Sequence, residues 1–285
     1  MVTQELDYQF VEGWAKLPPN WSFKQVAGVI VDSKDRVYAF NRGEHPIIVF
    51  DKNGYFIRSW GEGIFKNAHG SYIDSNDNVF CVDNVDHTVR KYNQHGDLLL
   101  TIGSVDRPNN EGGPFNKPTD LALGENGDIY VTDGYGASRV HRFTSNGELI
   151  QSWGKPGTGP GEFNLPHGVW VYKRRVYVAD RQNFRVQIFS TEGEYVAEWR
   201  GLERPCDVYV DKQGRFYVAE LHSRVTILND KGEVIKRLGG TKSFTPGEFV
   251  APHCVWTDSE GSLYVGEVLE GQRLQKFKVK QSHRV

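Results

Sequence analysis

Three histidines occupy the same place in three copies of an internal repeat: Ala-His-Gly at His69, Pro-His-Gly at His167 and Pro-His-Cys at His253. Each lies near the start of a short apolar stretch. Imidazole is a common zinc ligand, and three histidines that leave a fourth position open are typical of catalytic zinc sites. We therefore expect one metal ion here if the fold brings these residues together. Zinc is the first expectation, and imidazole also suits iron, copper and nickel.

The elements that must position these histidines are short strands that recur six times. A motif of the Val-Tyr-Val-Ala-Asp type is found at 37–41, 79–83, 129–133, 176–180, 216–220 and 263–267. Each copy follows a polar turn and precedes a second strand, and a Gly-containing turn then leads to a third strand, as in β-hairpins. Four short strands in roughly 40–50 residues, repeated, are typical of a β-propeller blade. The sequence therefore predicts an all-β fold, a six-bladed β-propeller.

The last copy of the repeat lacks a closing strand, and residues 8–14 have the form of that strand. We expect the N-terminal segment to pair into the last blade, because this pairing removes an exposed sheet edge. Residues 1–285 then form a single propeller domain. The expected blades are approximately 22–65, 66–105, 115–163, 164–202, 203–240 and 249–282, with 8–15 completing the last one.

The repeat also predicts which side chains meet at the axis, since the first strand of each blade lines the central channel. We name the residue five positions before the end of each first strand the axial residue. The axial residues of blades one to six are Ala27, His69, Thr119, His167, Cys206 and His253. The even blades thus carry histidine, and the three imidazoles should converge. The other histidines, in turns or outer strands, are expected at the surface: His45, His87, His95, His141, His222 and His283.

Composition narrows the class of protein. A formal net charge of −2 gives no argument for nucleic acid as a partner. Three cysteines do not suggest a disulfide scaffold and fit a reducing compartment. The first ten residues lack a secretory signal, and no apolar run approaches the ~20 residues that span a bilayer. We expect a cytoplasmic protein with a small-molecule or peptide-like substrate, no membrane contact and no obligate protein partner.

Four segments carry a resemblance to a known family: FNKPTD at 115–120, IYVTDGYGASR at 129–139, GEFNLPH at 161–167 and VADRQN at 178–183. Together they resemble the peptidyl-α-hydroxyglycine α-amidating lyases, six-bladed propellers related to NHL-repeat proteins. The resemblance implies zinc bound by His69, His167 and His253, Tyr135 as catalytic base, and Arg42 and Arg181 completing the site. It implies a metal-dependent lyase that cleaves an N-acyl or ureido α-hydroxyglycine to an amide and glyoxylate.

The positions of these residues agree with the repeat, because Arg42 and Arg181 directly follow the Tyr-Val-Ala-Asp-type strand of their blades and Tyr135 comes one residue later. The chain also departs from the animal members of the family. Cys254 replaces an aspartate that serves a structural calcium, which argues against calcium here. Ala251 replaces a methionine, and Gly136 replaces a disulfide cysteine.

Two alternatives remain at this point. One is a different metal-dependent lyase or hydrolase on the same propeller, acting on an ester, lactone or amide. The other is an NHL-type binding module for protein or RNA, which would not need three histidines in its channel.

Overall fold

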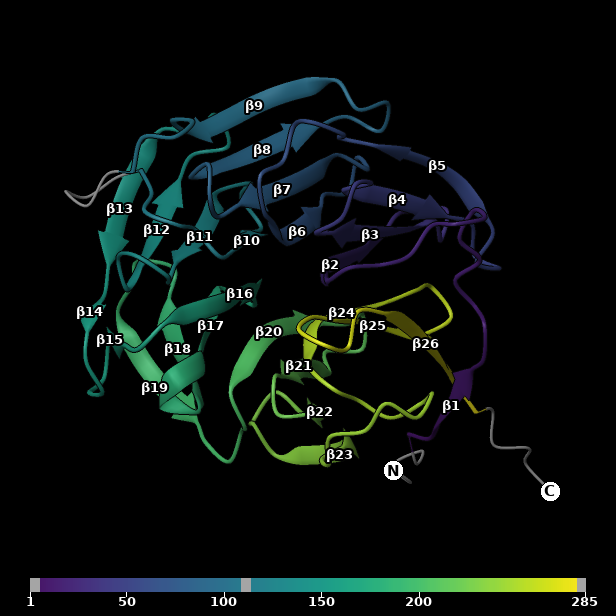
Figure 1. Ribbon diagram of the computed structural model, residues 1–285. Coiled ribbons are helices and arrows are strands. Elements are labelled where there is room, and N and C mark those ends of the chain that lie inside the picture. Colours follow the sequence, from purple (N-terminus) through teal and green to yellow (C-terminus); the bar gives the residue numbers. More distant parts are fainter. Residues whose placement is uncertain (1–5, 109–113, 281–285) are drawn as a thin grey trace.

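The computed structural model describes residues 6–108 and 114–280, and these residues form six four-stranded antiparallel sheets around a central axis (Figure 1). This confirms the six-bladed β-propeller. The first blade contains β2 (Val26–Val31), β3 (Val37–Asn41), β4 (Ile47–Phe50) and β5 (Phe56–Trp60). The second contains β6 (Ala68–Ile73), β7 (Val79–Asp83), β8 (Thr88–Tyr92) and β9 (Leu98–Gly103). The third contains β10 (Asp120–Leu123), β11 (Ile129–Asp133), β12 (Arg139–Phe143) and β13 (Leu149–Trp153).

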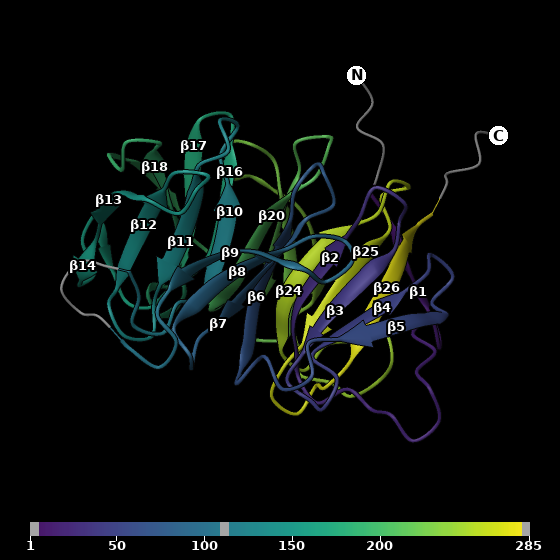
Figure 2. The same cartoon turned by 90° about the horizontal axis from the view of Figure 1, so that it is seen from above.

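The fourth blade contains β16 (Pro166–Tyr172), β17 (Arg175–Asp180), β18 (Arg185–Ser190) and β19 (Tyr195–Trp199). The fifth contains β20 (Pro205–Val210), β21 (Phe216–Glu220), β22 (Arg224–Leu228) and β23 (Val234–Gly239). The sixth contains β24 (Pro252–Thr257), β25 (Leu263–Glu267), β26 (Leu274–Val279) and β1 (Tyr8–Val11). The repeat did not predict the short parallel pair β14 (Lys155–Pro156) and β15 (Glu162–Phe163) or the 3-10 turn η1 (Arg181–Asn183). Seen from the side of the ring, the inner strands β6, β10, β16, β20 and β24 run between its two faces (Figure 2).

The ring closes through its N-terminal strand, as the sequence predicts. β1 pairs antiparallel with β26, with Tyr8 opposite Val279 and Val11 opposite Lys276. The last blade is therefore assembled from both ends of the described chain, and the edge of β26 is covered. The expected end of this blade at residue 282, and His283, lie outside the described residues.

The repeated motif explains why each blade folds locally. In the turn between the first two strands, Asp32 Oδ1 accepts hydrogen bonds from the backbone N–H groups of Lys34 and Arg36, both at 2.9 Å. The tyrosine of the motif, Tyr38, donates its hydroxyl to Asp32 Oδ2 at 3.1 Å. The same tyrosine–aspartate bond recurs in the fifth and sixth blades. In the turn between β4 and β5, Gly54 has a φ of +83°, a conformation that costs glycine little.

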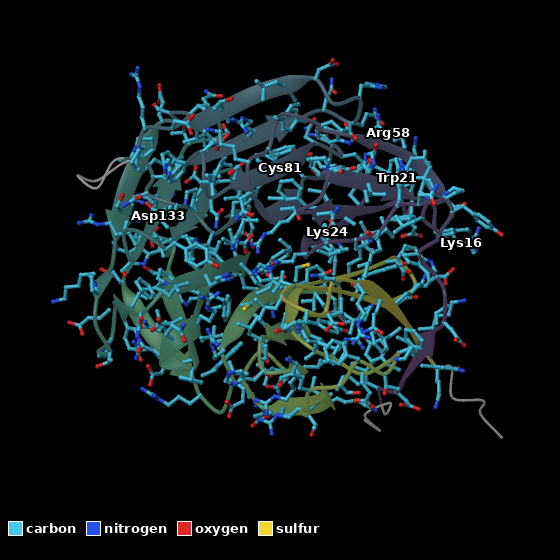
Figure 3. All side chains as sticks on the ribbon, in the orientation of Figure 1. Lys16, Trp21, Lys24, Arg58, Cys81 and Asp133 are labelled. Carbon is cyan, nitrogen blue, oxygen red and sulfur yellow. The ribbon has the colours of Figure 1, made fainter. Side chains whose placement is uncertain are left out.

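The cores lie between neighbouring blades, where the apolar side chains of the inner strands pack face to face. All three cysteines are free and buried, among them Cys81 on β7 (Figure 3). Along the described ranges, no helix has the length and apolar character needed to cross a membrane.

Candidate metal centre

Each of the three axial histidines sits at an irregularity in the first strand of its blade. The antiparallel register shifts between Ala68 and Ser71, and equivalent shifts fall around His167 and His253. A bulge adds a residue to one strand and re-aims a side chain, so it turns the imidazole towards the channel. The histidines are 0%, 1% and 4% exposed in chain order, and the site is thus shielded from bulk water.

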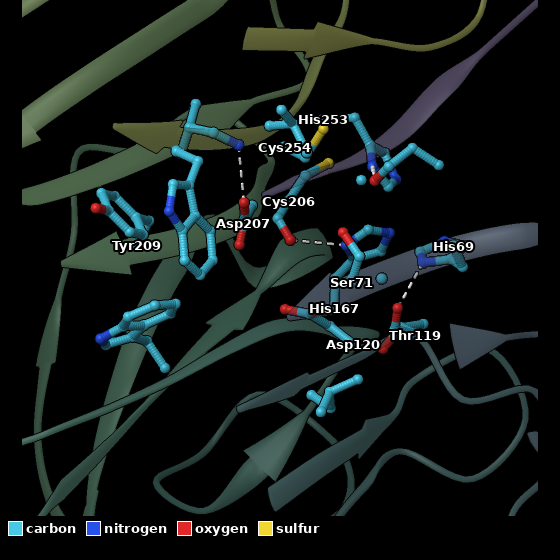
Figure 4. Close-up of a pocket in the computed structure, with 18 residues that line it drawn as sticks. His69, Ser71, Thr119, Asp120, His167, Cys206, Asp207, Tyr209, His253 and Cys254 are labelled. Carbon is cyan, nitrogen blue, oxygen red and sulfur yellow. Dashed lines mark hydrogen bonds between the residues drawn. The ribbon is translucent and has the colours of Figure 1, made fainter. Parts of the chain in front are cut away.

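The three imidazoles form a nearly equilateral triangle around the axis (Figure 4). Their ring centroids are 4.8 Å apart for His69 and His167, 4.8 Å for His167 and His253, and 4.9 Å for His69 and His253. One ring nitrogen from each lies within 4.8 Å of the other two. The structure therefore brings together the three residues that the repeat predicted to converge.

The odd blades hold these rings in place. Each Nδ1–H donates to the backbone carbonyl of the axial residue in the next blade, and this fixes the tautomer and directs the other nitrogen to the axis. The three bonds run from His69 to Thr119 (2.6 Å), from His167 to Cys206 (2.7 Å) and from His253 to Ala27 (2.8 Å). Orientation by a carbonyl is common among metal-binding histidines.

The histidines are held in the neutral form that can ligate a metal. Burial lowers the pKa of His69 and His167 well below the usual range, and in His253 burial and the charge of Arg42 lower the pKa to about 3. The positive charge of Arg181 also lowers the pKa of all three histidines, and that of Arg42 lowers the pKa of His69 and His253. Three neutral imidazoles with their free nitrogens towards one axis fit a divalent transition metal.

Tyr135 and Arg181 lie directly over this triangle. The Tyr135 oxygen is 3.2 Å from His69 Nε2 and 3.3 Å from His167 Nε2. Arg181, the first residue of η1, donates from Nη1 to the same oxygen at 3.4 Å. Tyr135 follows β11 by two residues and is 38% exposed, so its hydroxyl joins the buried histidines to the solvent side of the channel.

Arg42 reaches the site from the first blade. Its Nε donates to the carbonyl of Ala68, which precedes His69, and its Nη1 donates to Gln25 Oε1, both at 2.8 Å. Burial lowers the pKa of Arg42, and the nearby charge of Arg181 adds to that effect. All six residues expected at the site are therefore gathered at one end of the channel, which we call the mouth.

Sequence reasoning missed two carboxylates that support the triad. Asp120 and Asp207 directly follow the axial residues of blades three and five, and their Oδ2 atoms accept from the N–H groups of Val169 (3.1 Å) and Val255 (2.9 Å). Burial raises the pKa of both carboxyls, and the charge of Asp207 raises that of Asp120 further. An aspartate after the axial residue in two repeat copies was the signal available in the sequence.

Four aromatic rings close the channel on the far side of the histidines. They come from the residue three positions after the axial residue in blades two, four, five and six, and we call them the aromatic floor: Tyr72, Trp170, Tyr209 and Trp256. Ring centroids of neighbouring members are 4.7–5.8 Å apart. The cavity between the floor and the histidines measures about 20 Å³, room for about one water molecule.

Two histidines expected at the surface are buried instead. His141 is 1% exposed, because its position on β12 faces the neighbouring blade and packs beside Phe115 and Phe143. His87 is 7% exposed, and its Nδ1 accepts the N–H of Lys117 at 3.0 Å. The expectation failed since the repeat identifies a strand or turn but does not show what covers it.

Cys254, the residue after the third histidine, lines the cavity below the triad and directs its thiol to the backbone of the first blade. Its Sγ lies 3.6 Å from the carbonyl of Val26 and donates to it, and burial raises the pKa of the thiol well above the usual range. A protonated thiol is a poor metal ligand, so Cys254 acts in packing between the last and first blades.

The chain resembles known proteins in sequence and in fold. The family model of the NHL repeat matches residues 115–143. NHL repeat-containing protein 3 of Mus musculus is 30% identical over 271 residues, which cover 87% of this chain and 78% of that protein. Peptidyl-alpha-hydroxyglycine alpha-amidating lyase 1 of Drosophila melanogaster is 34% identical over 210 residues, 62% of this chain and 38% of the fly protein.

The solved structures agree on the fold. A gluconolactonase from Xanthomonas campestris has a TM-score of 0.68 at 12% identity, with 91% of this chain and 87% of that chain covered. At this identity the likeness concerns the propeller and not its chemistry. The extent of the match to the mouse protein decides the family: this chain is a six-bladed propeller of the NHL repeat-containing protein 3 family, homologous to the peptidyl-α-hydroxyglycine α-amidating lyases.

Proposed function

We propose that this protein is a metal-dependent lyase that cleaves an N-acyl or ureido α-hydroxyglycine into an amide and glyoxylate, with zinc as the metal. One observation carries the proposal: the Tyr135 oxygen lies within 3.3 Å of two of the three histidine nitrogens and 3.4 Å from Arg181. A proton acceptor, three neutral ligands and a fixed positive charge thus meet at one point.

The three histidines would hold the metal through Nε2, since Nδ1 of each one bonds to a backbone carbonyl. A divalent cation bound there would act as a Lewis acid towards an oxygen of the substrate. In its deprotonated form Tyr135 is placed to accept the proton of the substrate hydroxyl, and the Arg181 guanidinium stabilises the negative charge that the tyrosine oxygen carries before the transfer. As the C–N bond breaks, the same proton passes from Tyr135 to the departing amide nitrogen, so the reaction consumes no water.

The arginines would position the substrate. A guanidinium matches the planar carboxylate of the glycolate end, with two parallel hydrogen bonds. The hydrogen bonds from Arg42 Nε and Nη1 to Ala68 and Gln25 fix the direction of its guanidinium. Arg181, in contrast, has a buried Nε without a hydrogen-bond partner. We assign the carboxylate to these two residues. The aromatic floor excludes bulk water from below, which strengthens their electrostatic action.

The test is product analysis with N-benzoyl-α-hydroxyglycine and metal-loaded protein. The lyase reaction predicts benzamide and glyoxylate in equal amounts. A hydrolase acting on the amide would release benzoate instead, so benzoate as the acid product would replace this proposal with the hydrolytic alternative.

A binding role is the second candidate, because the mouse relative that matches most of this chain is named for its repeats alone. Purified protein that contains no transition metal, takes up none on dialysis and leaves the substrate intact would favour that role.

A further inference from the structure

Five blades build the mouth in the same way. In each, the residue after the second strand donates its backbone N–H to the carbonyl of the residue two positions before the axial residue. The five pairs, with N···O distances, are Arg42–Gln25 (2.9 Å), Asn84–Asn67 (3.4 Å), Arg181–Leu165 (3.1 Å), Leu221–Arg204 (3.0 Å) and Val268–Ala251 (3.1 Å). The pairs therefore stand at equivalent levels around the mouth. Arg204 on the fifth blade is an arginine of this ring that the proposed reaction does not use.

The guanidinium of Arg204 lacks any hydrogen-bond or ion-pair partner among the described residues, and its Nε is buried. The other arginines with a buried unpartnered nitrogen, Arg36, Arg90 and Arg181, each bond to a neighbour through another guanidinium nitrogen. A buried donor without a partner loses its hydrogen bonds to water and gains none in return. Such a group calls for a partner that arrives from outside the chain.

Arg204 lines a pocket of about 370 Å³ between the fifth and sixth blades. Its apolar wall consists of Leu221, Val250, Ala251 and Leu269. The other two basic side chains of the pocket already face acids: Lys242 pairs with Glu270, and His222 with Glu203, each at 3.4 Å. The unpaired positive charge of the pocket is therefore that of Arg204.

Two chain segments connect this pocket to the candidate metal centre. Arg204 lies two residues before Cys206, whose carbonyl accepts from His167 Nδ1. Ala251 lies two residues before His253 and packs against Ala27, whose carbonyl accepts from His253 Nδ1. The pocket is therefore next to the backbone segments that orient His167 and His253, on the same face of the ring as Tyr135.

We propose that this pocket takes the acyl part of the substrate and that the acyl chain ends in a carboxylate paired with Arg204. The inference rests on the proposed lyase function and names its substrate class: N-acyl-α-hydroxyglycines derived from short dicarboxylic acids. A short methylene chain fits the wall of Leu221, Val250 and Ala251, and a carboxylate matches the guanidinium fork. A neutral acyl group would leave the guanidinium unpaired and desolvated.

Calorimetry on the metal-loaded protein tests the pairing with two unreactive analogues that lack the hydroxyl: N-succinylglycine and its neutral isostere N-succinamoylglycine. The wild type should bind the dianion at least about tenfold more tightly. Arg204→Gln should abolish this preference, and Arg204→Lys should restore part of it. The matched control is Arg237→Gln, which removes the same charge from the exposed outer strand of the same blade. Equal binding of both analogues by the wild type, or an unchanged preference in Arg204→Gln, would overturn the inference.

Turnover separates this inference from the proposed function. Glyoxylate should form from both N-succinyl- and N-benzoyl-α-hydroxyglycine, with kcat/KM at least about tenfold higher for the succinyl compound. Glyoxylate from both at equal kcat/KM would refute the role of Arg204 and leave the lyase standing. No glyoxylate from either would refute the lyase itself.

Discussion

The Nδ1–H of His253 donates to the carbonyl of Ala27 at 2.8 Å, a bond between the last blade and the first that joins residues 226 positions apart. The contact that closes the ring on its inner side is therefore also the contact that orients the third histidine of the candidate metal centre. Strand β1 closes the same blade on its outer side. Closure of the propeller and completion of the metal centre are thus coupled.

Replacing His167 with alanine should abolish stoichiometric metal binding. Two imidazoles would remain, one fewer than the three protein ligands of a catalytic zinc site. Elemental analysis of protein dialysed against zinc measures the effect. His95→Ala, which removes an exposed histidine, serves as the control and should keep its metal. Full metal content in His167→Ala would contradict the assignment of the triad.

Replacing Tyr135 with phenylalanine should lower kcat by about 10²–10⁴-fold, the usual contribution of a positioned acid or base. The ring remains, so its edge contacts with His69 and His167 persist. Metal content should stay at the wild-type level, since the tyrosine is not needed as a ligand. A variant with normal turnover of N-benzoyl-α-hydroxyglycine would remove Tyr135 from the mechanism.

Replacing Gly168 with alanine should weaken metal binding without touching a ligand. A Cβ there would lie 2.5 Å from the carbonyl oxygen of Cys206, the acceptor of the His167 bond, so that carbonyl must move. We expect a loss of about 1–3 kcal/mol in unfolding free energy and a 10–100-fold weaker metal affinity, on the order of other losses of orienting partners. Gly124→Ala, which meets the movable side chain of Asn126, is the comparison. Equal metal affinity in the two variants would show that the carbonyl does not matter.

Acid should destabilise the metal-free protein through the triad. The pKa of each histidine is lower in the folded state than the ordinary value near 6.5, and that of His253 falls to about 3. Below pH ~6.5 the unfolded chain therefore binds protons that the folded chain does not, and the free energy of unfolding decreases as the pH falls. Urea unfolding at pH 7, 6 and 5 after chelation measures this, and a flat profile would contradict the burial of neutral histidines.

The two buried carboxyls of the channel, Asp120 and Asp207, have the opposite effect on the free energy of unfolding, because their pKa values are raised in the folded protein. The pKa of Asp207 rises to about 7 through burial, so the folded state binds the extra proton between pH ~4 and 7, and acid favours folding at this group. Asp207→Asn removes that term and can keep the acceptor for Val255. The loss of stability on acidification should therefore be steeper in Asp207→Asn than in the wild type. A shallower profile would mean that Asp207 is already ionised in the folded protein.

The sequence predicts the blades and the axial histidines because repetition turns spacing along the chain into position around a ring. It could not predict the bonds from Nδ1 to Thr119, Cys206 and Ala27, since these use backbone carbonyls, which every residue type carries. The bulges at the histidines are likewise a property of register and not of composition. The surface position predicted for His141 was wrong, because the alternation of side chains along a strand does not show which of the two faces a neighbouring blade covers.

The aromatic floor has a kinetic consequence. Because Trp170 and Trp256 meet across the far end of the channel with ring centroids 5.4 Å apart, both products of the proposed reaction would have to depart past Tyr135. In the proposed reaction, glyoxylate beside the histidines would lie deeper than the amide, whose acyl end would point to Arg204. Release would then be ordered, with the amide first. Glyoxylate should therefore inhibit competitively against substrate, and the amide noncompetitively.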